Sequence, residues 1–291
     1  MRTVRAPATS ANLGSGYDTF GVALSHPADI VRVERADRTT IEVTGAGAQF
    51  IPEDPEKNTV GAVADALDAP AHIEIDKGVR PASGLGSSAA SAAGAALALN
   101  DLYDRGYSRE ELVPIAAEGE AVVSGAAHAD NVAPALLGGF TIATETGVRS
   151  VGTDVPLVAC LPEEPISTRE AREVVPTHLT IEELVTTVGN AATLSIGMCR
   201  SDPELVGAGM ADEVVTPNRA ALITGYDDAV AAAREAGAHG VTVSGSGPGV
   251  LAVCPPQRRR AVASAMVEAF EENGEDARAY RTWTGDGAEF V

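Results

Sequence analysis

The chain has 291 residues, of which 45% are hydrophobic and 21% are charged, ordinary proportions for a globular protein with a sizeable core. Its 41 acidic residues outnumber 21 basic ones, giving a formal net charge of −20, and Lys57 and Lys77 are the only lysines. A surface of that sign repels nucleic-acid phosphates, so the composition argues against DNA or RNA binding.

Enrichment in acids with scarce lysine resembles the composition of proteins from salt-accumulating archaea, and it informs on environment rather than on fold. Met1–Ser10 lacks the apolar run of a signal peptide, and the most apolar stretch, Ala89–Leu99, is too short for a membrane span. Cys160, Cys199 and Cys254 form no Cys-x-x-Cys pair, which favours reduced thiols over a zinc site or disulfides. We therefore expect a soluble cytoplasmic protein without membrane contact.

In the first half of the chain, strand-like alternation is interrupted by glycine and proline. The predicted strands are Val31–Glu34, Thr40–Val43, His72–Asp76 and Gly139–Ala143, and the predicted helices are Thr59–Leu67, Ser87–Tyr103 and Glu110–Ala121. A change of composition at Gly147–Asp154 predicts a junction between domains spanning 1–152 and 153–291.

Beyond that junction, strands and helices alternate without the strict rhythm of a doubly wound sheet. The pattern predicts strands at Leu157–Leu161 and Ala277–Thr282, two strands around a glycine turn within Gly240–Cys254, and helices at Thr180–Arg200, Asn218–Glu235 and Gln257–Glu272. We therefore predict an α+β fold in two domains.

The most informative segment is a glycine-rich loop that leads into a helix. It consists of Pro81, Ala82, Ser83, Gly84, Leu85, Gly86, Ser87, Ser88, Ala89, Ala90 and Ser91. Glycine lets the backbone approach a ligand closely, and the first amides of a helix have no internal partner, so such a loop can bind phosphate. An ordinary serine-capped helix is the alternative interpretation when the loop is considered alone.

Two other nucleotide-binding motifs fit poorly. A Walker A loop needs Gly-Lys-Ser/Thr, but Lys57 is followed by Asn58 and Lys77 by Gly78. The letters Gly84-x-Gly86-x-x-Ala89 match a dinucleotide fingerprint, which follows a strand immediately, whereas Arg80-Pro81-Ala82-Ser83 intervene here. The NAD-binding interpretation is therefore weak.

Two further loops could bind a ligand, but neither indicates a binding site when it is considered alone. Ser244–Gly249 can expose successive amides to an anion or can simply join two strands. Pro7–Asp18 carries many short polar side chains on a glycine-containing loop.

Together, in this order and at these positions, the three loops resemble the signature motifs of the GHMP small-molecule kinases. Further segments are similar to the homoserine kinases of that superfamily: His128–Pro134 with Gly138-Gly139-Phe140, Thr168–Arg172 and Pro217–Arg219. The resemblance spans essentially the whole chain. It implies an N-terminal domain that binds ATP, a C-terminal ferredoxin-like domain, an active site between them, and a homodimer.

The resemblance also implies roles for individual residues. ATP would bind Pro81–Ser91, with Asn58 and Arg80 near the adenine and phosphates, and Mg²⁺ would bind Ser88 and Glu120. Ser88, Glu120 and Asn131 would be catalytic. The amino-acid substrate would contact Asn12, Asp18, His128, Asp130, Asn131, Thr168, Arg172, Arg219, Ser246 and Gly247. Judged alone, Glu120, Arg172 and Arg219 would be surface charges, and Asp18 a turn residue.

The implied reaction is the transfer of phosphate from ATP to L-homoserine, a step toward threonine. Two alternatives remain open at this point. One is a GHMP kinase for mevalonate or a sugar, and the other is a catalytically silent nucleotide-binding regulator with the same fold.

Overall fold

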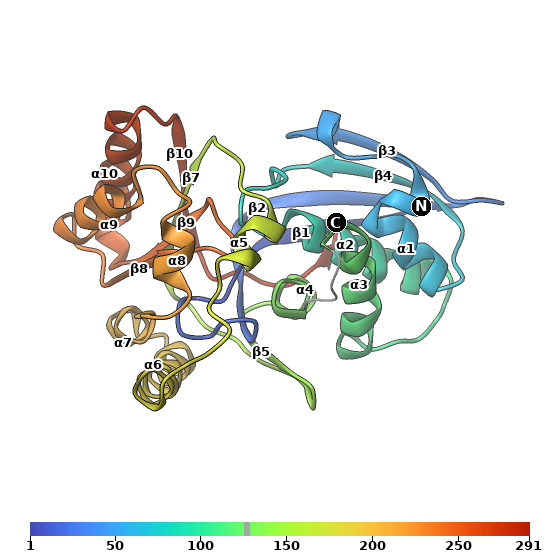
Figure 1. Ribbon diagram of the computed structural model, residues 1–291. Coiled ribbons are helices and arrows are strands. Elements are labelled where there is room, and N and C mark those ends of the chain that lie inside the picture. The colour runs from blue at the N-terminus through green and yellow to red at the C-terminus, as the bar shows by residue number, and fades with distance from the viewer. Residues whose placement is uncertain (125–128) are drawn as a thin grey trace.

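The computed structural model describes residues 1–124 and 129–291, with two β-sheets in an α+β arrangement as predicted (Figure 1). The larger sheet has the order β11-β1-β2-β4-β3, and β5 pairs with both β2 and β6. Its strands are β1 (Arg2–Ala11), β2 (Phe20–Arg35), β3 (Thr40–Gly45), β4 (Ala71–Lys77), β5 (Phe140–Thr144), β6 (Gly147–Val151) and β11 (Glu289–Phe290). Its pairs are antiparallel except β3 with β4.

Four helices gather on one side of this sheet: α1 (Thr59–Ala66), α2 (Ser87–Leu102), α3 (Arg109–Ser124) and α4 (Ala129–Leu137) (Figure 1). The central helix α2 is rich in alanine because it packs closely against the sheet. A Cβ atom on its Gly94 would lie 2.7 Å from Val31 Cγ2 on β2. Small side chains thus let α2, whose first turn adjoins the glycine-rich loop, approach the strands.

The smaller sheet is antiparallel, in the order β10-β7-β9-β8. Its strands are β7 (Pro156–Pro162), β8 (Gly240–Val243), β9 (Val250–Val253) and β10 (Ala277–Trp283). Helices α5 (Thr168–Glu173), α6 (Ile181–Arg200), α7 (Pro203–Gly209), α8 (Thr216–Ala220) and α9 (Tyr226–Glu235) connect β7 to β8, and α10 (Arg259–Glu272) connects β9 to β10. This connectivity is the expected ferredoxin-like β-α-β-β-α-β arrangement.

Two hydrophobic cores lie on the two sides of β7. Leu157, Ala159 and Leu161 of β7 belong to the same buried cluster as the larger sheet and its helices. The alternate β7 residues Val158 and Cys160 join a second cluster with α9 and α10. Because side chains alternate along a strand, β7 connects the two cores.

We propose that the domains divide after residue 152, between β6 and β7. The larger sheet, however, also includes β11, whose Phe290 pairs with Val4 of β1. The chain therefore returns to its N-terminal sheet at the end. The predicted junction Gly147–Asp154 contains β6, a strand of the larger sheet.

Most predicted elements lie within three residues of those observed, but the strand predicted at Val31–Glu34 covers only the end of β2, which begins at Phe20. One helix prediction was wrong. The single helix expected at Asn218–Glu235 is two helices, α8 and α9, separated by residues 221–225. Gly225 precedes α9 with φ of 77°, a left-handed conformation that interrupts a continuous helix. Within residues 1–124 and 129–291, no helix is long and apolar enough to cross a membrane.

Candidate active site

A cavity of about 510 Å³ opens where the glycine-rich loop, α3, α4, α5 and α8 meet. It brings together residues from distant parts of the chain. Of the candidates, it is lined by Asn12, Asp18, Asn58, Pro81, Ala82, Ser83, Gly84, Gly86, Ser87, Ser88, Ser91, Glu120, Asp130, Asn131, Thr168, Arg172, Arg219 and Ser246.

The glycine-rich loop lies between the end of β4 and the start of α2. Gly84 and Gly86 both have positive φ, 76° and 59°, and a Cβ on Gly84 would lie 2.5 Å from the Ser244 carbonyl oxygen. This close contact joins the loop to the segment Ser244–Gly249, and Ser244 Oγ also donates to the Gly84 carbonyl at 2.7 Å. Gly86 caps α2 without any side-chain hydrogen bond, so the first amides of that helix are available to an anion.

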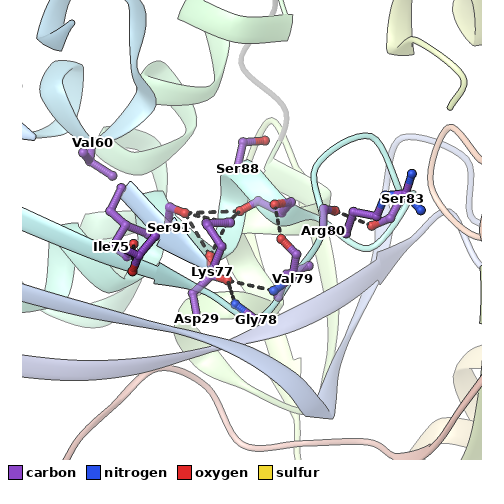
Figure 2. Close-up of polar contacts among 12 residues, drawn as sticks. Asp29, Val60, Ile75, Lys77, Gly78, Val79, Arg80, Ser83, Ser88 and Ser91 are labelled. Atoms are coloured by element: carbon purple, nitrogen blue, oxygen red, sulfur yellow. Dashed lines mark hydrogen bonds and ion pairs between the residues drawn. The ribbon is translucent and has the colours of Figure 1, made fainter. Parts of the chain in front are cut away.

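A buried network that the sequence did not reveal holds both flanks of this loop (Figure 2). Lys77, at the end of β4, forms a buried ion pair with Asp29 of β2 and donates to the Ser87 carbonyl and to Ser91 Oγ, each at 2.8 Å. Asp29 accepts from the backbone amides of Gly78 and Val79, each at 3.0 Å. One carboxylate therefore fixes the strand end before the loop and, through Lys77, the helix start after it.

Ser88 and Glu120 lie together at the start of α2. Ser88 Oγ donates to Glu120 Oε2 at 2.9 Å, and Glu120 lies in the C-terminal half of α3. Burial raises the pKa of Glu120 to about 7, while the Ser88 hydrogen bond and the positive charge of Lys77 act in the opposite direction. A bound cation would favour the ionised carboxylate at this position.

The other end of the cavity contains two arginines and two aspartates. Arg219 is buried, donates through Nη1 to the Gly245 carbonyl at 2.7 Å, and lies over the Tyr17 ring at 5.1 Å. Arg172 contacts Asp18, with Nη2 3.4 Å from Oδ1. Positive and negative groups therefore face one small volume, a pattern suited to a zwitterion.

Asn12 and Asp130 complete this end of the cavity. Asn12 Oδ1 accepts from the Asp18 amide at 2.9 Å, and its Nδ2 donates to the Gly245 carbonyl at 2.9 Å. Asp130 is buried, and its Oδ1 has no hydrogen-bond partner among the described residues. Burial raises the pKa of Asp130 to about 6, and the charge of Asp18 adds to that rise. A buried oxygen without a hydrogen-bond partner is typical of a position where a bound ligand donates a hydrogen bond to the protein.

Some candidates lie outside the cavity lining. Leu85, Ala89 and Ala90 are core residues, and Gly247 packs near Ile223 and Val243. Arg80 points away, toward Glu163, with Nη1 3.6 Å from Oε1. Asn58 lines the cavity, but its side chain caps α1 and donates to the Pro52 carbonyl at 2.6 Å. His128 lies outside the described residues.

Sequence reasoning missed the apolar end of the cavity. Phe50, Ile51, Pro52 and Ile75 line it, and Phe50 is 75% exposed. An exposed aromatic ring at the mouth of a cavity is well placed to stack on a flat base. The apolar run Phe50-Ile51-Pro52, directly before the charged segment 53–57, was the available signal in the sequence.

Two family models match the chain. The GHMP kinases N terminal domain covers residues 57–139, and the GHMP kinases C terminal model covers residues 194–272. Homoserine kinase of Halorubrum lacusprofundi is 70% identical over 288 residues, covering 99% of this chain and 98% of the relative. The chain belongs to the homoserine kinase family of the GHMP kinases.

Other homoserine kinases agree with this assignment. That of Haloquadratum walsbyi is 72% identical over 288 residues, covering 99% of both chains. The solved homoserine kinase of Cytophaga hutchinsonii superposes with a TM-score of 0.89 at 34% identity, covering 100% of this chain and 97% of that one. The mevalonate kinase of L. major has a TM-score of 0.75 at 15% identity, which shows the shared fold alone.

These findings confirm the predicted resemblance, the two-domain GHMP architecture and the class of ATP-dependent kinase. The haloarchaeal homoserine kinases also fit the halophilic composition of the chain.

Proposed function

We propose that this chain transfers the γ-phosphoryl group of ATP directly to the hydroxyl of L-homoserine, giving ADP and O-phospho-L-homoserine on the way to threonine. The observation that carries this proposal is the composition of one cavity. A phosphate-binding helix start with Ser88 and Glu120 opens onto a pocket that contains Arg172, Arg219, Asp18 and Asp130. The arginines match a carboxylate and the aspartates an ammonium group, and homoserine carries both.

At the ATP end, the amides at the start of α2 would bind the phosphates, and the apolar lining with Phe50 would hold the adenine. Ser88 and Glu120 offer hydroxyl and carboxylate oxygens, the hard ligands that Mg²⁺ prefers, so these residues fit the ion. When bound, Mg²⁺ would neutralise charge on the transferring phosphoryl group.

At the acceptor end, we propose that no side chain acts as a general base. An amide cannot accept a proton at neutral pH, so Asn131 would orient the hydroxyl by hydrogen bonding. A loose, metaphosphate-like transition state needs little activation of the nucleophile. Asp18 and Asp130 would then bind the substrate without taking its proton.

The mutants Asp130→Asn and Asp18→Asn test this division of roles. Each should raise KM for homoserine about tenfold, because a charge-assisted contact is lost, and should lower kcat less than that. Steady-state kinetics at saturating ATP measure both constants. A loss of roughly 10²–10⁴ in kcat at saturating homoserine would instead identify a general base.

We further propose that the chain is a homodimer, with α6 at the interface. Ile181, Val185, Val188 and Ile196 follow helical spacing on its solvent side and are 50–76% exposed. No charged residue occurs from 184 to 199, although the chain has a net charge of −20. In an antiparallel pair of α6 helices related by a twofold axis, Glu182 of each copy would lie beside the partner's C-terminal Arg200.

Light scattering coupled to size-exclusion chromatography in molar KCl should therefore give twice the 29.6 kDa chain mass. Val188→Glu should shift the protein to the monomer, because the substitution places like charges at the centre of the contact. Val291→Glu is the matched control, because Val291 is also an exposed valine but lies outside α6. A monomeric parent protein, or a Val188→Glu variant that stays dimeric, would contradict this interface.

The reaction itself is tested by ADP release in a coupled assay with homoserine, mevalonate and galactose as acceptors. We expect turnover with homoserine alone. Turnover of mevalonate or galactose but not homoserine would assign a different GHMP reaction, and no turnover with any acceptor would favour the silent regulator. Because ATP and amino-acid precursors are intracellular metabolites, we propose a cytoplasmic location.

A further inference from the structure

Thr9 lies on β1 between the two halves of the candidate active site and is fully buried. Its backbone amide donates to the carbonyl of Leu85 at 3.1 Å, and Leu85 belongs to the glycine-rich loop, the proposed phosphate-binding loop. Its hydroxyl donates to Asn131 Oδ1 at 2.7 Å. One residue thus contacts both the loop proposed to hold ATP and the side chain proposed to face the acceptor.

The packing around this contact leaves little room for change. A Cβ atom on Gly86 would lie 2.0 Å from Thr9 Oγ1 and 2.8 Å from Asn131 Oδ1. Gly86, the residue before α2, therefore lies directly against the hydrogen-bonded pair. The absence of a side chain at Gly86 allows Thr9, Asn131 and the phosphate-binding loop to meet at one point.

The hydrogen bond has a consequence for the Asn131 amide. A primary amide has one accepting oxygen and one NH₂ group that only donates. Because Oδ1 already accepts from the Thr9 hydroxyl, we assign the donating Nδ2 as the amide end that serves the cavity that Asn131 lines. With the amide reversed, the buried Thr9 hydroxyl hydrogen would lose the acceptor it has here.

We propose that Thr9 is a positioning residue that selects this amide orientation, so that Asn131 presents an N–H donor to the oxygen of the acceptor hydroxyl. This inference rests on the proposed role of Asn131. Thr9 also fixes the distance between that donor and the phosphate-binding loop, through its second bond to Leu85. Alignment of the two reacting groups is the main requirement of phosphoryl transfer.

Four variants test the proposal: Thr9→Val, Thr9→Ser, Asn131→Ala and the double variant Thr9→Val/Asn131→Ala. Valine keeps the size of threonine without its hydroxyl, whereas serine keeps the hydroxyl. Thr9→Val should lower kcat about tenfold, with KM for ATP and for homoserine changed less than about twofold. Thr9→Ser should retain at least about half of the parent kcat.

The double variant should be no slower than Asn131→Ala, because Thr9 acts through Asn131. Equal losses in Thr9→Val and Thr9→Ser would show that the methyl group matters, and losses that multiply in the double variant would show independent roles. Either result overturns the proposal.

Thermal melts of each variant check that it folds. If Thr9→Val does not fold, Thr9→Ala also lacks the hydroxyl and should show the same loss of kcat and the same non-additivity with Asn131→Ala.

The same set separates this inference from the function on which it rests. If Asn131→Ala phosphorylates homoserine at the parent rate, the proposed role of Asn131 is wrong and the Thr9 inference falls with it, while the substrate assignment stands. If Asn131→Ala is slow but Thr9→Val is not, only the Thr9 inference falls.

Discussion

Replacing Glu120 with glutamine should lower kcat/KM by about a hundredfold. Loss of one electrostatic contact that stabilises charge in the transition state typically has an effect of this size. The amide keeps the shape of the carboxylate and its contact with Ser88 but is a weaker ligand for a hard cation. If Glu120 acts through Mg²⁺, raising the Mg²⁺ concentration should restore part of the activity. Initial rates across a Mg²⁺ titration at fixed ATP give this result.

Glu118→Gln is the matched control, because Glu118 lies on the same helix, α3, but is exposed. That variant should behave as the parent at every Mg²⁺ concentration. A Glu120→Gln enzyme that is equally defective across the titration would argue that the carboxylate acts without the metal.

Replacing Arg219 with alanine should lower kcat/KM for homoserine by about tenfold to a hundredfold while leaving KM for ATP within about twofold. The Arg219 side chain is buried and lines the cavity end that contains Arg172, so its loss would remove a desolvated contact to the substrate carboxylate. Arg172→Ala should have the smaller effect, since its side chain is 42% exposed and more strongly screened by solvent.

Arg219→Lys separates charge from shape, because lysine keeps the charge and loses the planar fork that matches a carboxylate. We expect partial activity from it. Arg234→Ala, at an exposed arginine of α9, is the control for general loss of positive charge. If KM for ATP rises instead of KM for homoserine, the arginines belong to the nucleotide and the two ends of the cavity have been exchanged.

Sequence reasoning identified the part of the candidate site whose signal is local, the glycine-rich loop. Gly84 and Gly86 were informative because a tight loop before a helix requires positive φ, which few other residues adopt. The family resemblance then supplied residues such as Arg172 and Arg219, whose local sequence alone indicated surface charges. In the structure, both line the cavity.

What the sequence could not supply are contacts between residues far apart in the chain. Asp29 and Lys77 are separated by 48 positions, and Thr9 and Asn131 by 122, so no local pattern links them. A lone lysine or threonine within a strand gives no sign of its partner. The break between α8 and α9 was missed for a related reason, because a single glycine can lie within a helix or end it.

The central claim, transfer of phosphate to the side-chain hydroxyl of homoserine, is tested most directly by ³¹P NMR of the reaction with ATP, Mg²⁺ and L-homoserine. The account predicts one new phosphomonoester resonance, split by the neighbouring CH₂ protons and equal in amount to the ADP formed. Inorganic phosphate in place of that resonance, or an acyl-phosphate signal from the carboxylate, would contradict it.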